Sequence, residues 1–304
     1  MLSSAAMAQS GPGLLLKPGP ADKPLEFQAN VLRLLEAETD NEVDLDLTIV
    51  ESDGRWRFLP AQPLGPSVGY EVMYLDFDTD HAAVPERLVD VSIAGGSAFA
   101  KSGDWWFAAT AGVGYAGESP FADNQAWYGK ASIIIGRELW GGILVGIIDY
   151  NGNRAIFPDV PLPGLAITKQ VSPHLSYVIG IPYSSLTWKP TPELRVDLRY
   201  TLPETIDVAV QYDLTPQISI LGSFDNRLRA FHLDDLPSDR RIFFEQSRAE
   251  LGVKYSPMEN LGILVAGGYA FGQELSTGFD ARDLDEITEI SDEPYIRVGV
   301  EFRP

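Results

Sequence analysis

From Leu25 to the C-terminus, the chain repeats short segments in which apolar and polar residues alternate. The clearest runs from Glu193 to Tyr200, with leucine, valine and tyrosine on one face and charged residues on the other. A period of two residues predicts β-strands, because successive side chains of a strand point to opposite faces. Pairs such as Thr191-Pro192 and Thr215-Pro216 separate the segments and are typical of turns. The pattern therefore predicts an all-β chain built from antiparallel hairpins.

Connection lengths suggest how the hairpins are arranged. Short turns near 101–104, 137–140, 172–173, 191–192, 215–216 and 256–257 broadly alternate with longer connections near 79–87, 117–125, 151–163, 233–240 and 273–293. Outer-membrane barrels have short periplasmic turns and longer extracellular loops. No segment approaches the roughly 20 apolar residues of a membrane helix, and a closed barrel is the other structure that satisfies every backbone group in lipid. We therefore expect a single antiparallel up-and-down transmembrane β-barrel.

The strand number follows from segment lengths. Counting every alternating segment gives about 16 strands, but several between 164 and 200 are shorter than the roughly 9 to 11 residues of a tilted spanning strand. We therefore expect about 12–14 strands. The first is predicted from Phe27 to Glu36, with a short helix from Val31 as the alternative. Asp53-Gly54 is interpreted as a turn, and the acidic run from Gln273 to Glu293 as a long loop.

The two faces of the strands permit two folds. A soluble β-sandwich would place the charged face in water, whereas a membrane barrel places it in a polar lumen, and both have a period of two. The number of strands and the aromatic residues at strand ends favour the barrel. The predicted lumen-lining residues are Arg195, Asp197, Arg199, Arg248, Glu250, Arg297 and Glu301. The predicted interfacial aromatic residues are Trp140, Tyr150, Trp188, Tyr200, Tyr212 and Tyr255.

Composition narrows the classes of function. A net charge of -20 argues against nucleic-acid binding, which needs a basic surface. The absence of cysteine excludes disulfides, thiolate metal sites and cysteine nucleophiles. Of the three histidines, His81 and His232 lie near aspartates, which leaves a hydrolase at the barrel rim as a minor alternative. The acidic 273–293 run lacks the ligand pattern of a calcium loop. We therefore expect no catalytic residues, no metal site and no cofactor.

The N-terminus resembles the end of an export signal. Ala6-Met7-Ala8 has the small-x-small pattern of a signal-peptidase site, although the basic and apolar regions that precede such a site are missing. Residues 1–8 are therefore interpreted as a signal-peptide remnant. Residues 9–24 are rich in glycine and proline and predict a flexible lead-in. The barrel is expected to occupy residues 25–304.

The central part of the chain resembles a bacterial family known as domain of unknown function 6268. The resemblance rests on Ile181-Pro182, Leu186-Thr187-Trp188-Lys189-Pro190, the strand from Glu193 to Leu198, Leu202-Pro203 and Val208-Ala209-Val210-Gln211-Tyr212. It implies an outer-membrane β-barrel without an assigned activity. The last strand, which ends at Phe302, also resembles the recognition signal of such barrels, although Arg303 and Pro304 follow the aromatic residue.

These patterns together predict a protein of the bacterial outer membrane. The first hypothesis is a passive channel or small-solute transporter with a charged lumen and an unidentified solute. The alternative is a non-conducting structural or binding barrel with acidic extracellular loops. The expected partners are outer-membrane lipid, lipopolysaccharide and the barrel-assembly machinery, with no nucleic acid among them.

Overall fold

The computed structural model describes residues 23–304 except 41, 61, 63, 203–204 and 235. The predicted signal-peptide remnant and nearly all of the predicted lead-in lie outside the described residues. In the part of the chain that is described, 18 strands form one sheet. Their bounds are β1 Leu25–Leu34, β2 Ala37–Glu38, β3 Asp44–Arg57, β4 Ser67–Thr79, β5 Arg87–Ser102, β6 Trp105–Gly117, β7 Trp127–Leu139, β8 Gly142–Asn151, β9 Leu162–Ser172, β10 Leu175–Ile181, β11 Tyr183–Trp188, β12 Leu194–Thr201, β13 Thr205–Asp213, β14 Ile218–Phe231, β15 Arg241–Met258, β16 Leu261–Gly278, β17 Asp285–Ile290 and β18 Glu293–Phe302.

The sheet closes on itself. Each strand of the ring pairs antiparallel with its neighbours, and β1 joins β18 to β3 to complete the circle. The short strands β2 and β17 extend β1 and β18, so the closed ring has 16 strands. The predicted all-β single antiparallel barrel is confirmed. The expected 12–14 strands was too low, because β10 to β13 hold 6 to 9 residues and still pair on both sides.

Two local predictions were wrong for identifiable reasons, and one alternative does not form. The chain does not turn at Asp53-Gly54, because β3 runs straight through this pair. A Cβ at Gly54 would lie 2.6 Å from the Tyr70 ring, so this glycine makes room for an aromatic side chain. The acidic run from Gln273 to Glu293 contains the end of β16, all of β17 and the start of β18, because Leu275, Thr288 and Ile290 within it are buried against the barrel. The helix from Val31 does not form.

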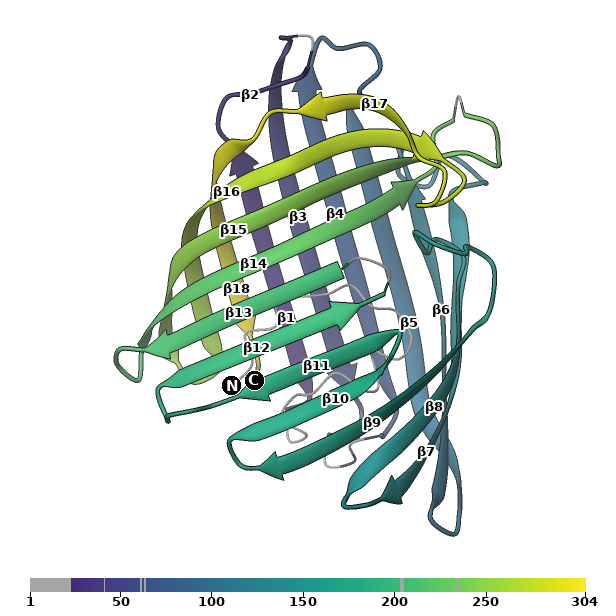
Figure 1. Ribbon diagram of the computed structural model, residues 1–304, viewed down its shortest axis with the longest axis vertical. Coiled ribbons are helices and arrows are strands. Elements are labelled where there is room, and N and C mark those ends of the chain that lie inside the picture. Colours follow the sequence, from purple (N-terminus) through teal and green to yellow (C-terminus); the bar gives the residue numbers. More distant parts are fainter. Residues whose placement is uncertain (1–22, 41, 61, 63, 203–204, 235) are drawn as a thin grey trace.

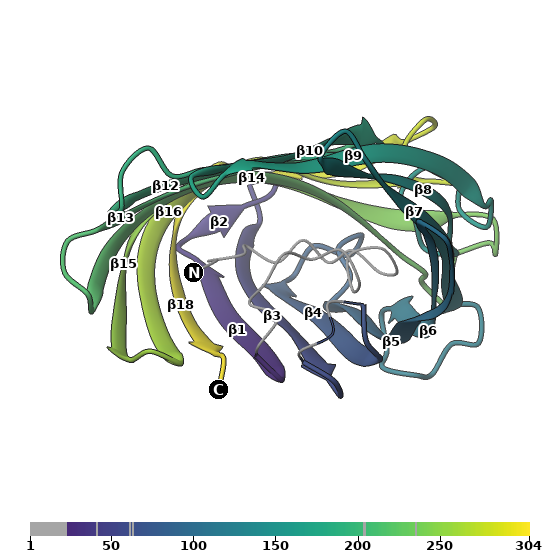
Figure 2. The same ribbon diagram turned by 90° about the horizontal axis from the view of Figure 1, so that it is seen from below.

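The barrel is flattened and uneven in height. In Figure 1, β3 to β6 stand nearly upright at the back, whereas β10 to β16 cross the front obliquely. Figure 2 shows β10 to β14 along one long side of the outline and β1, β3, β4 and β5 along the other. We call the end with β2 and β17 the upper end. The C-terminus lies toward the opposite, lower end, where the short turns connect most hairpins.

In the upper part of the barrel, the two long walls pack against each other through apolar side chains. We call this buried set the upper core, and it is formed by Leu32, Leu34, Ala37, Leu45, Leu47, Ile49, Met73, Leu75, Phe77, Val84, Leu88, Ala116, Phe231, Ile242, Phe244, Ala270, Leu275, Ile290 and Tyr295. Phe77 of β4 meets Phe244 of β15 edge to face at 5.8 Å between ring centroids. The upper interior therefore resembles the core of a β-sandwich.

A backbone contact across the barrel reinforces this closure. The amide of His232, just after β14, donates a hydrogen bond of 2.9 Å to the carbonyl of Ala116 near the end of β6. Gly117 and His232 also form an isolated parallel bridge, although β6 and β14 are not neighbours in the ring. At the upper end the two walls thus meet between β6 and β14. We call the part of the ring between these two strands, β7 to β13, the side lobe.

The lower outer surface carries a continuous belt of exposed apolar side chains. Its members face outward from nearly every strand, at positions that alternate with inward-facing residues. We call this set the outer belt; it includes Val31, Trp56, Ile93, Val113, Ile133, Ile148, Leu165, Ile179, Leu198, Val210, Leu251, Val265, Ile296 and Val298. In the described residues, no helix is long and apolar enough to cross a membrane.

Candidate lumen

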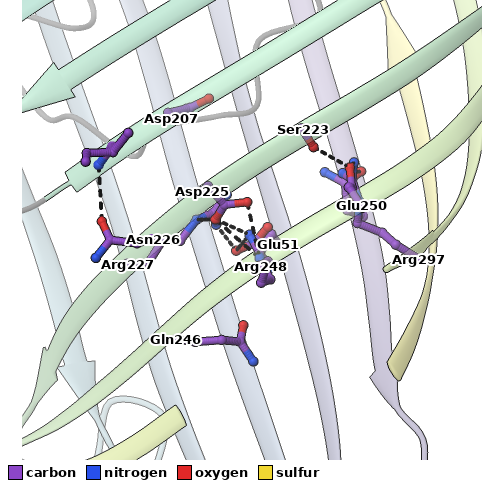
Figure 3. Close-up of polar contacts among 12 residues, drawn as sticks. Glu51, Asp207, Ser223, Asp225, Asn226, Arg227, Gln246, Arg248, Glu250 and Arg297 are labelled. Carbon is purple, nitrogen blue, oxygen red and sulfur yellow. Dashed lines mark hydrogen bonds and ion pairs between the residues drawn. The ribbon is translucent and has the colours of Figure 1, made fainter. Parts of the chain in front are cut away.

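Below the upper core, the interior is bridged by ion pairs. Glu51 of β3 reaches across to Arg227 of β14 and pairs with its guanidinium group. Arg248 of β15 approaches the same carboxylate at 3.8 Å and binds Asp225 at 2.9 Å. Figure 3 shows Arg248 beside the carboxylates of Glu51 and Asp225, which come from different strands. Because β3 and β14 are not neighbours, these contacts tie opposite walls together.

A second group of charges continues the bridge toward β18 and β1. Arg297 donates from Nε to Glu250 at 2.8 Å and from Nη1 to Asn30 at 3.0 Å. Ser223 and Tyr295 also donate to the Glu250 carboxylate, at 2.8 and 3.1 Å. We call Glu51, Asp225, Arg227, Arg248, Glu250 and Arg297 the ion-pair layer. Its three carboxylates face three guanidinium groups, so the layer is balanced in charge.

Little space remains inside the ion-pair layer. A cavity of about 40 Å³ lies among its side chains, next to Gln28 and Asn30. One water molecule needs roughly 10–15 Å³ of such space, so the cavity holds a few waters and no larger solute. A solute that passed here would first have to separate Glu51 from its partners.

All seven predicted lumen residues point to the inside of the barrel, in three groups. Arg195 and Asp197 of β12 bind each other at 2.5 Å and are almost fully buried, and Arg199 approaches Asp207 at 3.7 Å. Arg248, Glu250 and Arg297 belong to the ion-pair layer. Glu301 accepts a hydrogen bond of 2.7 Å from Lys254. The structure therefore brings together Glu250 and Arg297 and keeps the β12 group separate.

The sequence interpretation missed Glu51, Asp225 and Arg227. Glu51 was lost because the strand was expected to end at the Asp53-Gly54 turn. The signal was present, since Glu51, Asp53 and Arg55 continue the inward series of β3. Asp225 and Arg227 likewise alternate with outward residues along β14. Their cross-wall partnership has no sequence signal, because the paired residues are far apart in the chain.

The six predicted interfacial aromatic residues lie on the outer face or at a turn. Trp188, Tyr212 and Tyr255 lie at lower strand ends, and Trp140 is 77% exposed in the tight β7–β8 turn. Tyr200 lies at the upper end of β12. Tyr150, at the upper end of β8, donates a hydrogen bond of 2.7 Å to Asp159.

At the upper end, the loop between β8 and β9 is fastened to the β15 and β16 ends. Arg241 of β15 donates to the Phe279 carbonyl at 2.8 Å, to Asn153 Oδ1 at 3.2 Å and to the Arg154 carbonyl at 3.2 Å. Burial among these neutral acceptors lowers the pKa of Arg241 to about 10. Asp280 accepts hydrogen bonds from Arg282, which lower the pKa of its carboxyl, and from the Phe157 amide at 3.2 Å.

The three histidines lie in three different connections of the barrel. His81 accepts a hydrogen bond from the Ala83 amide at its Nδ1 and lies in the loop after β4. Burial lowers the pKa of His232, and the nearby Arg241 charge acts in the same direction. His174 lies in the lower turn after β9, where its amide donates to Ser172. In the same part of the chain, no group of three or more His, Cys, Asp or Glu side chains is arranged to hold a metal ion.

Several solved structures share the barrel architecture. A Pseudomonas aeruginosa FadL homologue is 10% identical, with a TM-score of 0.42, over 93% of this chain and 92% of that chain. The COG4313 outer membrane channel from Pseudomonas putida F1 is 11% identical, with a TM-score of 0.37, over 94% and 99%. The Pseudomonas putida toluene transporter TodX is 8% identical, with a TM-score of 0.36, over 96% and 93%. Such distant likeness carries no argument about cargo.

No protein-family model matches the chain. A search of curated proteins also finds no match.

Proposed function

We propose that this chain is a β-barrel of the bacterial outer membrane that passes small solutes across it. The observation that supports the location is the outer belt. Soluble monomers rarely expose contiguous apolar patches beyond a few hundred Å², whereas the belt surrounds the whole lower barrel. An outward apolar band with polar residues inside is the arrangement of transmembrane β-barrels.

The closed ring and its inner face support passage. Among the described residues, the ring leaves no free sheet edge in the lower barrel, and most inward positions of β1, β3, β12, β14, β15 and β18 below the upper core are polar or charged. The channels of large barrels are lined in this way. A solute-conducting barrel therefore remains the function that the interior supports best.

A non-conducting barrel is the second candidate, because the walls are joined above and within the membrane level. The upper core seals one end, and the ion pairs of Glu51 cross the interior. A barrel of this kind would act as a structural or binding protein. Its acidic upper connections would then be the surface that meets a partner.

Two measurements on detergent-refolded protein separate these candidates. Heat-modifiable migration on a gel tests the barrel itself, and a protein that is monomeric and soluble without detergent would return the chain to the soluble class. Planar-bilayer conductance and swelling of proteoliposomes then test passage. Solute uptake supports the channel, whereas a silent bilayer together with unswollen liposomes supports the non-conducting barrel. Liposomes that carry heat-denatured protein serve as the control.

Membership in domain of unknown function 6268 and recognition by the barrel-assembly machinery stay predictions. The amphipathic β18 supports the second, since Ile296, Val298 and Val300 alternate with inward-facing residues up to Phe302. Contact with lipopolysaccharide is part of the same proposal and rests on the outer belt. A rim hydrolase requires esterase or protease activity that is lost on substitution of His81 or His232.

A further inference from the structure

The side lobe has an inner surface unlike the rest of the barrel. We call the inner faces of β9, of β10 and of β8 from Ile143 to Ile147 the neutral wall. None of its members is charged, and their register places them side by side, as in the row formed by Val145, Ala166 and Gly180. The neutral wall consists of Ile143, Val145, Ile147, Gly164, Ala166, Thr168, Ser176, Val178 and Gly180.

The outer neighbours of these residues belong to the outer belt, so this part of the barrel is apolar on both faces. Ile148, Leu165 and Ile179 are each more than half exposed on the outside. The neutral wall must therefore face the interior. On its lower side it joins a small buried cluster of Ala108, Ile134 and Val145.

Space inside the barrel is distributed unequally between the two parts. Arg195, Asp197, Asp207, Asp225 and Arg248 are almost fully buried, because their ion pairs fill the interior beside them. Every member of the neutral wall except Val145 is instead half-buried, although it faces inward. The open part of the lumen thus lies beside the neutral wall.

Charges beside the neutral wall above its lower rim are already compensated; at the rim itself, Glu138 of β7 lies opposite Ile143. Asp149, at the upper end of β8, pairs with Arg154 at 2.6 Å. Lys130 donates to Ser92 at 2.9 Å and lies 3.5 Å from Glu71. Arg195 and Asp197 pair on the other flank. An ion that moved along this wall would lose hydration without gaining a free counter-charge, whereas an uncharged molecule would lose little.

We propose that solutes pass along the neutral wall and that they are small uncharged molecules. The ion-pair layer is then a fixed contact that holds the two walls together. This inference rests on the proposed function, because it needs a conducting barrel. It makes Ala166 and Val178 specificity-determining positions, since both project into the open part of the lumen. On this inference, the buried charges of the other strands stabilise the barrel.

The test is uptake by proteoliposomes that contain the full-length protein. Arabinose is the uncharged probe, gluconate the anion and choline the cation. We expect arabinose to enter at least about fivefold faster than either ion. Ala166→Trp and Val178→Trp should each lower arabinose uptake about tenfold, because each fills the open lumen. Ile167→Trp is the matched control; its side chain faces lipid, and uptake should stay within about twofold.

Two further variants keep the test decisive. Heat-modifiable migration of each variant shows whether its barrel has formed. Val178→Asp adds a charge with little change in volume and should raise choline uptake relative to arabinose, which a merely structural position would not do. Equal uptake of the three probes would overturn the inference. So would a rise in uptake on Glu51→Gln without an effect of Ala166→Trp, since the path would then cross the ion-pair layer. Wild-type protein that admits none of the probes would instead refute the proposed function itself.

Discussion

The upper and lower halves of β3 place the same kinds of residue on opposite faces. In the upper half, Leu45, Leu47 and Ile49 point inward and are buried, while Asp44 and Asp46 face out. In the lower half, Glu51 and Arg55 point inward, while Trp56 faces out and is exposed. The strand keeps one period of two throughout, and the reversal occurs between Ile49 and Glu51.

The reversal shows where the surroundings of the barrel change. An apolar inside and a polar outside are stable in water, whereas a polar inside and an apolar outside are stable in lipid. The upper half therefore behaves as a small soluble sandwich, and the lower half as a membrane barrel. The two folds that a period of two permits are both present, one above the other. Lysine substitutions above and below this reversal test the contrast between the two halves.

The largest effect is expected in the upper core. Leu47→Lys would place a charge where the native side chain is fully buried. Burying an unpaired charge in an apolar core is among the few changes that cost more than about 4 kcal/mol of unfolding free energy. The next residue faces outward, and Thr48→Lys should change the unfolding free energy by less than about 0.5 kcal/mol. The urea midpoint in detergent micelles, followed by tryptophan fluorescence, compares them. Equal midpoints would contradict the buried upper core.

The second effect concerns the outer belt. Leu251→Lys places the charge on an outward position that is 66% exposed, which would be harmless on a soluble protein. On the lipid face of a barrel, a lysine near the midplane costs about 2–4 kcal/mol. Stability in lipid vesicles is the measurement, with Thr48→Lys again as the control. A Leu251→Lys variant as stable as the wild type would show that this outer face does not lie in lipid, and would contradict the contrast between the upper and lower halves.

The third effect compares two ion pairs, one inside and one outside. Glu51→Gln leaves Arg227 with Asp225 but removes the carboxylate that joins the walls. Loss of charged hydrogen bonds of this kind costs about 1–3 kcal/mol. Asp46→Asn removes the exposed pair with Arg33 on the upper outer face, which is worth about 0–1 kcal/mol. Equal costs in the same urea titration would mean that Glu51 does not bind the walls together.

The smallest effect is a response to pH at the upper end. The folded-state pKa of Asp280 lies below its usual range, because Arg282 holds the carboxylate. A lowered folded-state pKa stabilises the contact above the unfolded pKa of about 3.9, and this stability is lost as pH falls through the folded value. A Phe157→Trp reporter, beside Arg282, should keep constant fluorescence from about pH 8 to 5 and change below about pH 4. Asp280→Asn should abolish that change, and a transition near neutral pH would contradict the assignment.

Sequence patterns predicted the barrel because strand alternation and short turns are local signals. That the seven charged residues point inward could be predicted for the same reason, since a residue's face follows from its parity within one strand. The number of strands was harder to predict from the sequence, because β10 to β13 are short and their place in the ring depends on partners along both edges. Above them on the same wall, β14, β15 and β16 are longer, with 14, 18 and 18 residues.

The reversal within β3 could not be predicted from local pattern. Leu47 and Trp56 are both large and apolar, and only their distance from the membrane level decides which one faces inward. The partners of Glu51 raised a similar difficulty, since Arg227 is distant in sequence and lies on the opposite wall. Gly54 gave a misleading turn signal, because the sequence alone does not distinguish a glycine that makes room for an aromatic ring from one that turns the chain.

The hydrogen bond from His232 to Ala116 has a consequence for how this protein can vary during evolution. The chain leaves the upper sandwich after Gly117 and returns to the same point at His232, so the two ends of the segment that holds β7 to β14 are already adjacent. Hairpins inserted into or deleted from β7 to β13 would alter the circumference of the side lobe without moving the strands of the upper core. The side lobe can thus be lengthened, shortened or exchanged as a cassette while the remainder of the barrel keeps its register.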